Sequence, residues 1–255
     1  MTDQHAVILK NKQIAPHYYE MVLKFDALPP LHCGQFLNFL LPHSEDTLLR
    51  RPFGINDFDE QNNTVTFVYA VVGKGTERMT QLKAGEATDV LLPLGNGFHL
   101  KDEEKKVLIL GGGTGVLPLM SVFKTYPDKE YYSYLGFRSK DEMLKADVFQ
   151  SHSVETVIAT DDGSFGKKGY INTYALQEID RIRPDVVLLC GPQAMYPSVQ
   201  PYGKKYRILV SMEQRMGCGM GACLVCTCKT QEGDKTRQKR VCKDGPVFEI
   251  GEVVL

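Results

Sequence analysis

The sequence predicts a three-part protein that combines an all-β region with an α/β region: an antiparallel β barrel, a doubly wound parallel sheet and a small C-terminal lobe. Three observations predict this fold class. Apolar and polar residues alternate with a period close to two up to about residue 100. Apolar strands then alternate with helical segments, and from Glu213 onward cysteine, glycine and charged residues dominate. We therefore place the domain boundaries at residues 1–102, 103–212 and 213–255.

The first region shows the alternation typical of half-buried strands. In YYEMVLKF, residues 18–25, every second residue is apolar or aromatic. Similar short runs separated by Gly, Pro, Asn and Asp predict an antiparallel barrel. The segment TERMTQLK, residues 76–83, predicts a short helix within it. The further strands are expected in QFLNFLL (35–41), RRPFGIN (50–56), TVTFVYAVV (64–72) and TDVLLPL (88–94).

The second region alternates buried-looking strands with helical segments, which predicts a parallel sheet wrapped by helices. The strands are expected in VLIL (107–110), YYSYLGF (131–137), VETVIAT (154–160), DVVLLC (185–190) and YRILVS (206–211). The helices are expected in GVLPLMSVFKTY (115–126), KDEMLKADVFQ (140–150) and GYINTYALQEI (169–179).

The composition excludes several classes of partner. The chain has 255 residues, of which 43% are apolar and 24% charged, and its net charge is -1. This balance does not favour binding to nucleic acid or to an anionic membrane. The N-terminus lacks the pattern of a signal peptide, and no apolar run is long enough to span a bilayer. We expect a cytoplasmic protein.

The third region carries the most specific motif of the chain. Cys218, Cys223 and Cys226 follow the spacing C-x4-C-x2-C, and fifteen further residues separate Cys226 from Cys242. This spacing is typical of a plant-type [2Fe-2S] cluster, whose irons are held by four thiolates. Glycines between the cysteines allow the backbone to wrap closely. Structural zinc, which favours two separated pairs of ligands, and a pair of disulfides are the alternatives. Cys228 is left over, as a buried thiol or a substitute ligand.

Two glycine-containing loops follow strands of the predicted parallel sheet. The first is GGGTG, and the second is CGP in LLCGPQAMY. Loops at the carboxyl ends of strands in one parallel sheet are where a dinucleotide binds; an ordinary strand-to-helix turn is the alternative. The predicted contacts are Gly111, Gly112, Gly113, Thr114 and Gly115 in the first loop and Cys190, Gly191 and Pro192 in the second.

Charged residues near this site bear on the choice of dinucleotide. Asp161 and Asp162 follow the third strand of the sheet, near the expected position of the adenosine ribose. Their carboxylates would repel a 2'-phosphate, whereas Arg138 and Lys140 would weakly attract one. We therefore expect NADH, with Asp161 at the ribose.

The segment LLRRPFGIND, residues 48–57, places two arginines at the start of a barrel strand. A guanidinium at a barrel rim suits a flavin pyrophosphate, because its fork of donors matches phosphate oxygens. Taken alone, the segment is better explained as a strand with a solvated basic start.

The order of these motifs identifies a family resemblance over nearly the whole chain. RPFG (51–54), VYAVVGKGT (68–76), PLGNGF (93–98), GGGTGVLPL (111–119) and CGPQAM (190–195) precede the cysteine-rich loop as they do in the ferredoxin reductase superfamily. More narrowly, SMEQRMGCGMGACLVC followed by VCKDGPVF resembles the electron transfer subunits of bacterial NAD-dependent dihydroorotate dehydrogenases of type B. The resemblance implies a barrel that binds FAD, a sheet domain that binds NAD(H) and a lobe with a [2Fe-2S] cluster.

The resemblance also implies flavin contacts. These are Arg51, Pro52, Phe53 and Gly54 along the flavin, Val68, Tyr69 and Ala70 on the next strand, and Gly75 and Thr76 at the pyrophosphate. Two positions depart from the family pattern. Gly54 stands where relatives often have Ser or Thr, and Ala70 replaces a frequent Arg. The phosphate charge would then be met by Arg50, Arg51 or Lys74.

The predicted function is an electron relay without a substrate-oxidising site of its own. None of the six histidines adjoins a motif, so we expect no catalytic side chain. The resemblance implies that electrons pass between NAD(H), FAD, the cluster and the FMN of a dihydroorotate dehydrogenase catalytic subunit, in a heterotetramer with two copies of each subunit, during pyrimidine synthesis. The alternatives are a flavin and iron-sulfur reductase subunit of a sulfhydrogenase or a ferredoxin-NADP reductase, and a zinc-stabilised binding module without catalytic activity.

Overall fold

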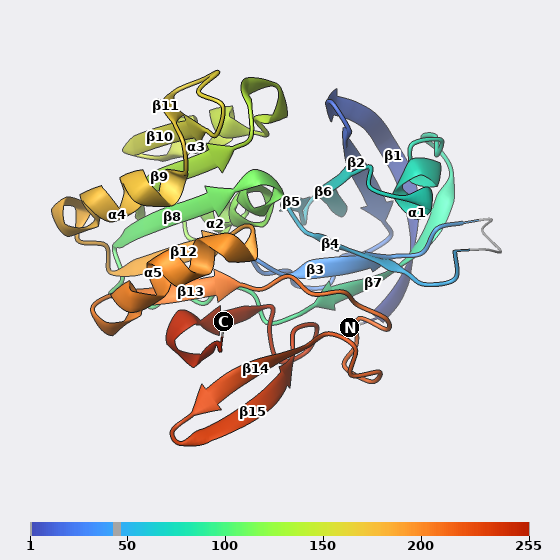
Figure 1. Ribbon diagram of the computed structural model, residues 1–255. Coiled ribbons are helices and arrows are strands. Elements are labelled where there is room, and N and C mark those ends of the chain that lie inside the picture. The colour runs from blue at the N-terminus through green and yellow to red at the C-terminus, as the bar shows by residue number, and fades with distance from the viewer. Residues whose placement is uncertain (1, 43–46, 255) are drawn as a thin grey trace.

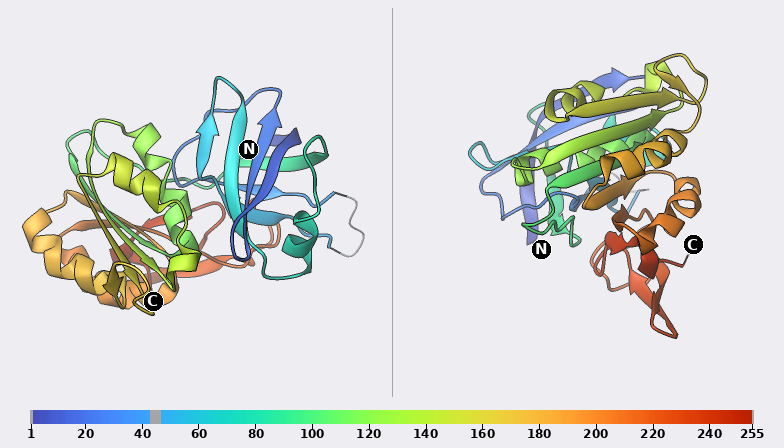
Figure 2. Two further views of the ribbon diagram at one scale, coloured as in Figure 1. Left: turned by 90° about the horizontal axis from the view of Figure 1, so that it is seen from above. Right: turned by 90° about the vertical axis from the view of Figure 1, so that its left-hand side faces the viewer.

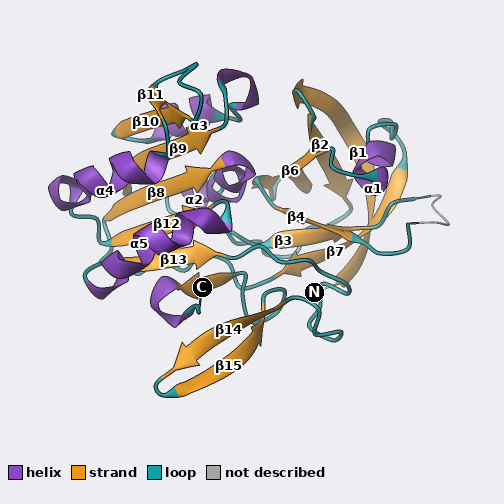
Figure 3. Ribbon diagram, in the orientation of Figure 1, coloured by secondary structure: helices purple, strands orange, loops and turns teal. Residues whose placement is uncertain are grey.

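The computed structural model describes residues 2–42 and 47–254 of the chain. Figure 1 shows three parts: a curved antiparallel sheet, a layered α/β domain and a small C-terminal lobe below their junction. Seen from above, the two larger parts stand side by side with the lobe beneath them (Figure 2). Most helices belong to the α/β domain (Figure 3).

The antiparallel part is a seven-stranded sheet in the order β4-β3-β7-β1-β2-β6-β5, which curls into a half barrel. Its core is formed by alternate residues, as the period of two predicts: Met21, Leu23 and Phe25 of β2 are all at most 1% exposed. The strands are β1 (Thr2–Ala15), β2 (Tyr18–Phe25), β3 (Phe36–Phe39), β4 (Arg51–Gly54), β5 (Asp57–Asp59), β6 (Thr64–Ala70) and β7 (Ala87–Leu94).

The α/β domain is built on a second seven-stranded sheet, in the order β11-β10-β9-β8-β12-β13-β16. All its strand pairs are parallel except β13 with β16, which lies antiparallel at the edge. The strands are β8 (Lys106–Gly112), β9 (Glu130–Phe137), β10 (Glu155–Thr160), β11 (Lys167–Lys168), β12 (Val186–Cys190), β13 (Arg207–Ser211) and β16 (Val247–Glu249).

Helices cover both faces of this sheet, which makes it doubly wound. Leu108 and Leu110 of β8 pack into the cluster that contains α4 (Ile171–Ile182) and α5 (Tyr196–Val199). Val107 and Ile109 pack on the other face, against η1 (Gly113–Leu119), α2 (Val122–Thr125) and α3 (Ala146–His152). The short 3-10 helices η2 (Lys140–Glu142), η3 (Gln193–Met195), η4 (Gln200–Lys204) and η5 (Ile250–Glu252) complete this part of the chain.

The C-terminal lobe is bound to both larger parts. It consists of a cysteine loop, defined here as residues 214–226, and the hairpin of β14 (Thr227–Glu232) and β15 (Lys235–Arg240). The strand β16 then returns into the parallel sheet, so that residues 213–254 contribute to two sheets. The buried cysteines of the lobe share one apolar cluster with Phe36 and Leu91 of the half barrel.

All four predicted helices differ from their predicted limits: the one expected at 169–179 is α4 (Ile171–Ile182), and the other three differ for local reasons. The helix expected at 76–83 is α1 (Lys74–Met79), because the Thr76 hydroxyl accepts the N–H groups of Val72 at 2.9 Å and Gly73 at 3.2 Å and so closes its first turn earlier. The segment 115–126 forms η1 and α2 instead of one helix, since Pro118 lies inside it and lacks a donor. The segment 140–150 is divided at Lys145, whose φ is 54°. Among the described residues, no helix has the length and apolar character to cross a membrane.

Candidate functional site

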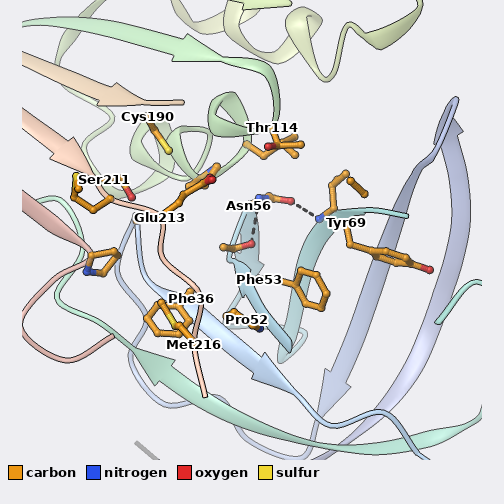
Figure 4. A pocket seen from close by; sticks show the side chains of 18 of the residues that line it. Phe36, Pro52, Phe53, Asn56, Tyr69, Thr114, Cys190, Ser211, Glu213 and Met216 are labelled. Carbon is orange, nitrogen blue, oxygen red and sulfur yellow. Dashed lines mark hydrogen bonds between the residues drawn. The ribbon is translucent and has the colours of Figure 1, made fainter. Parts of the chain in front are cut away.

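A cavity of about 390 Å³ lies between the half barrel and the α/β domain, and we call it the interdomain cavity. Its volume lies in the range of small-molecule sites. The sequence-predicted flavin contacts that line it are Pro52, Phe53 and Gly54 of β4, Val68, Tyr69 and Ala70 of β6, and Thr76 of α1. Figure 4 shows Phe53 and Tyr69 on the barrel side and Cys190, Ser211 and Glu213 on the sheet side.

Asn56 holds the two barrel strands of this wall together. Its side-chain nitrogen donates to the Gly54 carbonyl at 3.2 Å, and its oxygen accepts the Val68 N–H at 2.6 Å (Figure 4). The side chain is 3% exposed. Sequence reasoning missed Asn56; the signal was a polar residue directly after the RPFGI strand. It fixes the backbone of β4 and β6 where a ligand would lie.

One arginine of the RRPFG segment reaches the predicted pyrophosphate position and the other does not. The Arg51 guanidinium lies against Gly75, where an added Cβ would stand 2.4 Å from its Nε. Arg50 instead contacts the Asp3 carboxylate at 2.9 Å and the Asp89 carbonyl at 3.0 Å. Of these two arginines, the structure therefore brings Arg51 together with Gly75 and Thr76.

The structure gives a physical reason for Gly54. A Cβ at this position would lie 2.8 Å from Cγ of Pro118, which belongs to η1 of the α/β domain. This distance is shorter than real Cβ contacts, so a side chain would force the proline ring to shift. The proline therefore occupies the space that a larger residue in β4 would need.

A second cavity, of about 890 Å³, opens at the carboxyl ends of β8, β9, β10 and β12, and we call it the sheet-edge cavity. This is the edge where open parallel sheets bind dinucleotides. The predicted contacts that line it are Gly112, Gly113, Thr114, Asp161, Gly191 and Pro192. Arg138 lines it as well, so that a cation and a carboxylate both face the cavity, and Tyr18, Glu142, Tyr170 and Asn172 are contacts that the sequence did not indicate.

Three predicted dinucleotide contacts have other surroundings. A Cβ at Gly115 would stand 2.5 Å from the Cys190 carbonyl, and one at Gly111 would stand 2.7 Å from Val116. Neither glycine lines the interdomain cavity or the sheet-edge cavity, and both allow close packing behind the loop. Cys190 lines the interdomain cavity, not the sheet-edge cavity, and burial raises the pKa of its thiol.

The two cavities meet at Thr114 and Glu213, which line both. Glu213 lies two residues after the end of β13 and points into the interdomain cavity opposite Asn56 (Figure 4). The residue is exposed to solvent within the cavity, but partial desolvation by the protein around it raises the pKa of its carboxyl group. Sequence reasoning missed this residue, although a charged side chain at the end of the apolar strand YRILVS was a usable signal. A ligand in one cavity can touch a ligand in the other here.

The four predicted cysteine ligands form two neighbouring pairs. The Cys218 N–H points to Cys223 Sγ at 3.4 Å, and the Cys242 N–H points to Cys226 Sγ at 3.4 Å. Cys226 and Cys242 are 2% exposed, whereas Cys223 is exposed. Cys228 is a buried thiol on β14. Within residues 2–42 and 47–254, no group of three or more His, Cys, Asp or Glu side chains is arranged to hold a metal ion.

The cysteine loop directs backbone donors at its sulfur atoms. The N–H groups of Met220, Ala222 and Cys223 lie 3.3 to 3.4 Å from Cys218 Sγ. Burial opposes ionisation of the Cys218 thiol, but the N–H groups of Cys223, Met220 and Ala222 together lower its pKa to about 6. Two pairs of thiols surrounded by N–H donors fit an iron-sulfur cluster, whose ligands are thiolates and whose sulfur atoms accept hydrogen bonds.

Comparison with protein families agrees with this geometry. Residues 213–254 match the iron-sulfur cluster binding domain of dihydroorotate dehydrogenase B. Residues 109–201 match the oxidoreductase NAD-binding domain. The two matches cover the cysteine pairs and most of the residues around the sheet-edge cavity.

Relatives match over the full chain. The electron transfer subunit of dihydroorotate dehydrogenase B (NAD(+)) from Streptococcus mutans is 38% identical over 257 residues, which cover 99% of this chain and 98% of the relative. The same subunit from Caldanaerobacter subterraneus is 39% identical over 251 residues, which cover 98% and 97%.

Solved structures confirm the predicted fold class. An NADH-dependent reduced ferredoxin-NADP oxidoreductase superimposes with a TM-score of 0.84 at 28% identity, over 98% of this chain and 89% of that one. Phthalate dioxygenase reductase superimposes with a TM-score of 0.65 over 93% of this chain and 76% of that one, which shows a shared fold. The sequence relatives show more: the chain belongs to the family of electron transfer subunits of dihydroorotate dehydrogenase B.

Proposed function

We propose that the chain relays electrons between NAD(H) and the FMN of a dihydroorotate dehydrogenase catalytic subunit, using FAD and a [2Fe-2S] cluster. The observation that carries this proposal is the contact of the two cavities at Thr114 and Glu213. It allows a nicotinamide in the sheet-edge cavity to meet a flavin in the interdomain cavity. A nicotinamide transfers two electrons as a hydride, whereas an iron-sulfur cluster accepts one electron at a time. When bound, FAD would link the two, because a flavin can carry one or two electrons.

The chain's own residues hold and separate these groups. Arg51, which lies against Gly75, and Thr76, which lines the interdomain cavity, would bind the FAD pyrophosphate; Phe53 and Tyr69 would lie along the isoalloxazine ring. A Cβ at Gly113 would meet nothing within 4 Å, so this glycine leaves room for the NAD(H) pyrophosphate, and Asp161, which lines the sheet-edge cavity, would bind the ribose.

The cysteine loop begins at the wall of the interdomain cavity, which Gln214 and Met216 line. Met216 lines the cavity, and Cys218 follows two residues later. Cys218, Cys223, Cys226 and Cys242 would hold the [2Fe-2S] cluster. On the outside of the loop, Met220, Leu224 and Val225 are 39%, 60% and 57% exposed beside the exposed Cys223. This apolar surface next to a cluster ligand suits the docking of a catalytic subunit.

The remaining parts of the proposal concern the assembly and its compartment. We infer a heterotetramer with two copies of each subunit, located in the cytoplasm. Seven free thiols are compatible with a reducing compartment. The family function in pyrimidine synthesis requires no membrane or nucleic acid contact from this chain.

An absorption spectrum of anaerobically purified protein tests the cofactors. The proposal expects flavin bands together with the broad visible absorbance of an iron-sulfur cluster. Flavin bands alone would contradict the cluster assignment, and a colourless protein that contains zinc would support a binding module instead.

Co-purification with an FMN-containing dihydroorotate dehydrogenase subunit tests the pathway. The reconstituted complex should reduce NAD+ in the presence of dihydroorotate. A complex that forms stably, holds all its cofactors and shows no such activity would overturn the assignment and favour a ferredoxin-NADP reductase or sulfhydrogenase subunit.

A further inference from the structure

The strand β3 of the half barrel faces the barrel core on one side and the C-terminal lobe on the other. Leu37 and Phe39 point into the barrel core, whereas Phe36 packs with the buried cysteines of the lobe. Because side chains alternate along a strand, Asn38 lies on the same side as Phe36. Asn38 also pairs with Pro52 of β4, and both Phe36 and Pro52 line the interdomain cavity. Asn38 therefore stands between the cavity wall and the lobe.

The Asn38 side chain forms a hydrogen bond with the backbone of the cysteine loop at its first cysteine. Its Nδ2 donates to the Cys218 carbonyl at 3.2 Å. The next residue, Gly219, has a φ of +72° and packs so closely that an added Cβ would stand 2.4 Å from this Nδ2. Since a carbonyl can only accept, the amide nitrogen must be the atom that faces Cys218. The conformation of the loop at its first ligand is thus fixed by a barrel side chain.

This contact is maintained at a cost in stability. Asn38 is 1% exposed, and its Oδ1 has no hydrogen-bond partner among the described residues. A buried polar atom without a partner destabilises a protein. A leucine has nearly the same shape and would avoid this cost but would lose the hydrogen bond to the Cys218 carbonyl, so the contact with the cysteine loop accounts for an amide at this position.

We propose that Asn38 is a positioning residue for electron transfer: it holds the Cys218 side of the cluster at a fixed distance from the flavin wall. This inference rests on the proposed function. In each transfer one electron leaves flavin that NADH has reduced, and one ferric ion of the cluster becomes ferrous; Asn38 exchanges neither electron nor proton. Because electron tunnelling falls steeply with the separation of donor and acceptor, a loosened loop slows the transfer.

The test compares wild-type holoprotein with Asn38→Leu and Asn38→Ser by anaerobic stopped-flow spectroscopy and by EPR of the reduced cluster. Both variants should accept electrons from NADH into flavin at the wild-type rate. The following transfer from flavin to cluster should slow by roughly tenfold, as expected for a misplaced reacting group, and the EPR signal should broaden or shift. Using two variants keeps the test valid if leucine prevents assembly of the cluster.

Thr230→Val is the matched control. Thr230 lies in β14 of the same lobe, is 0% exposed and also has a buried side-chain oxygen without a partner in the described structure. Its replacement removes a similar polar atom, but among the described residues the Thr230 hydroxyl, unlike the Asn38 amide, makes no hydrogen bond to the cysteine loop. It should leave the transfer rate and the EPR signal unchanged.

Two outcomes would count against the inference in different ways. If Asn38→Leu or Asn38→Ser holds both cofactors and shows the wild-type transfer rate and EPR signal, Asn38 does not position the cluster. If wild-type protein lacks flavin or cluster absorbance, the proposed function itself fails, and this inference fails with it.

Discussion

Glu213 places a carboxyl group where the two cavities meet, and although the residue is exposed to solvent, partial desolvation raises the pKa of that group. A carboxyl group with a raised folded-state pKa favours folding most at pH values below its unfolded pKa of about 4.3. That contribution is lost as the pH rises through the folded-state pKa. The carboxylate thus weakens the fold at neutral pH.

We therefore expect Glu213→Gln to be more stable than wild type at pH 7. The gain should be less than about 1 kcal/mol, because cavity solvent screens the charge, and should vanish near pH 4. Urea denaturation between pH 4 and pH 8 measures it. Equal stability of the two proteins at every pH would show that Glu213 ionises without cost.

At the residue scale, the sequence predicted ligand types better than it predicted contacts. The spacing of the cysteines predicted four thiols as cluster ligands, and these thiols lie in two neighbouring pairs in the structure. Glycine carries less information: Gly112 lines a cavity, whereas Gly115 allows backbone packing, and both occur in the same GGGTG run. Glu213 was not predicted as a site residue, because a single charged residue after an apolar strand has many ordinary explanations.

At the scale of elements, the contact between β4 and η1 explains why Gly54 differs from the Ser or Thr expected from the family resemblance. A Cβ there would meet Pro118 at 2.8 Å. We expect Gly54→Ser to destabilise the protein by about 1–3 kcal/mol, the usual cost of overpacking. Adding Pro118→Ala should recover most of the loss, because the two residues are in direct contact. Chemical denaturation of the four proteins in this cycle measures the coupling.

Gly73→Ser is the control for this cycle. The φ of Gly73 is 179°, which any residue adopts, and an added Cβ would meet nothing within 4 Å. Its replacement at the start of α1 should change stability by less than about 0.5 kcal/mol. If Gly54→Ser and Gly73→Ser behave alike, or if the cycle shows no coupling, the steric explanation for Gly54 is wrong.

Most strands of the half barrel and of the parallel sheet could be predicted because the periods of two and of continuous burial are local properties. The short strands β5, β11 and β16 and the hairpin of β14 and β15 were not predicted. Helix limits could not be predicted either. The start of α1 depends on the Thr76 hydroxyl reaching back to Val72 and Gly73. The break before α3 depends on Lys145 adopting a left-handed conformation. Both are set by contacts that a hydrophobic pattern does not record.

At the scale of the whole molecule, the order of the three parts along the chain could be predicted, but the contacts between the parts could not. A hydrophobic period shows which face of a segment is buried but not which other segment covers it. The return of β16 into the parallel sheet, and the contact of Asn38 with Cys218, therefore appear only in the folded chain. The same holds for the polar joint between β2 and α3.

This polar joint centres on Glu20 of β2, whose side chain is 8% exposed. It binds Lys10 of β1 at 2.7 Å and also Lys145 at the start of α3. Burial acts to raise the pKa of the Glu20 carboxyl, but the hydrogen bonds from Lys10 and Lys145 outweigh it and lower the pKa. A lowered pKa means that the stabilisation is present at neutral pH and is lost as the pH falls through it.

Lys10 of the half barrel and Lys145 of the α/β domain bind the same Glu20 carboxylate. Replacing each lysine in turn therefore distinguishes an effect on the angle between the domains from an effect on local stability. Next to Lys145, Tyr18 donates to Glu142 at 3.5 Å, and both residues line the sheet-edge cavity. We expect Lys145→Met to loosen the angle between the domains and to raise KM for NADH roughly fivefold, equivalent to about 1 kcal/mol. Steady-state NADH oxidation with an artificial acceptor measures this.

Lys10→Met supplies the comparison, because it removes a cation from the same carboxylate without touching the α/β domain. Both variants should lose similar stability in chemical denaturation, about 1 kcal/mol each, since each leaves Glu20 one cationic partner. Only Lys145→Met should change KM, and added salt should weaken NADH binding in wild type more than in that variant. If both lysine variants raise KM equally, the effect comes from a destabilised barrel and the joint does not set the domain angle.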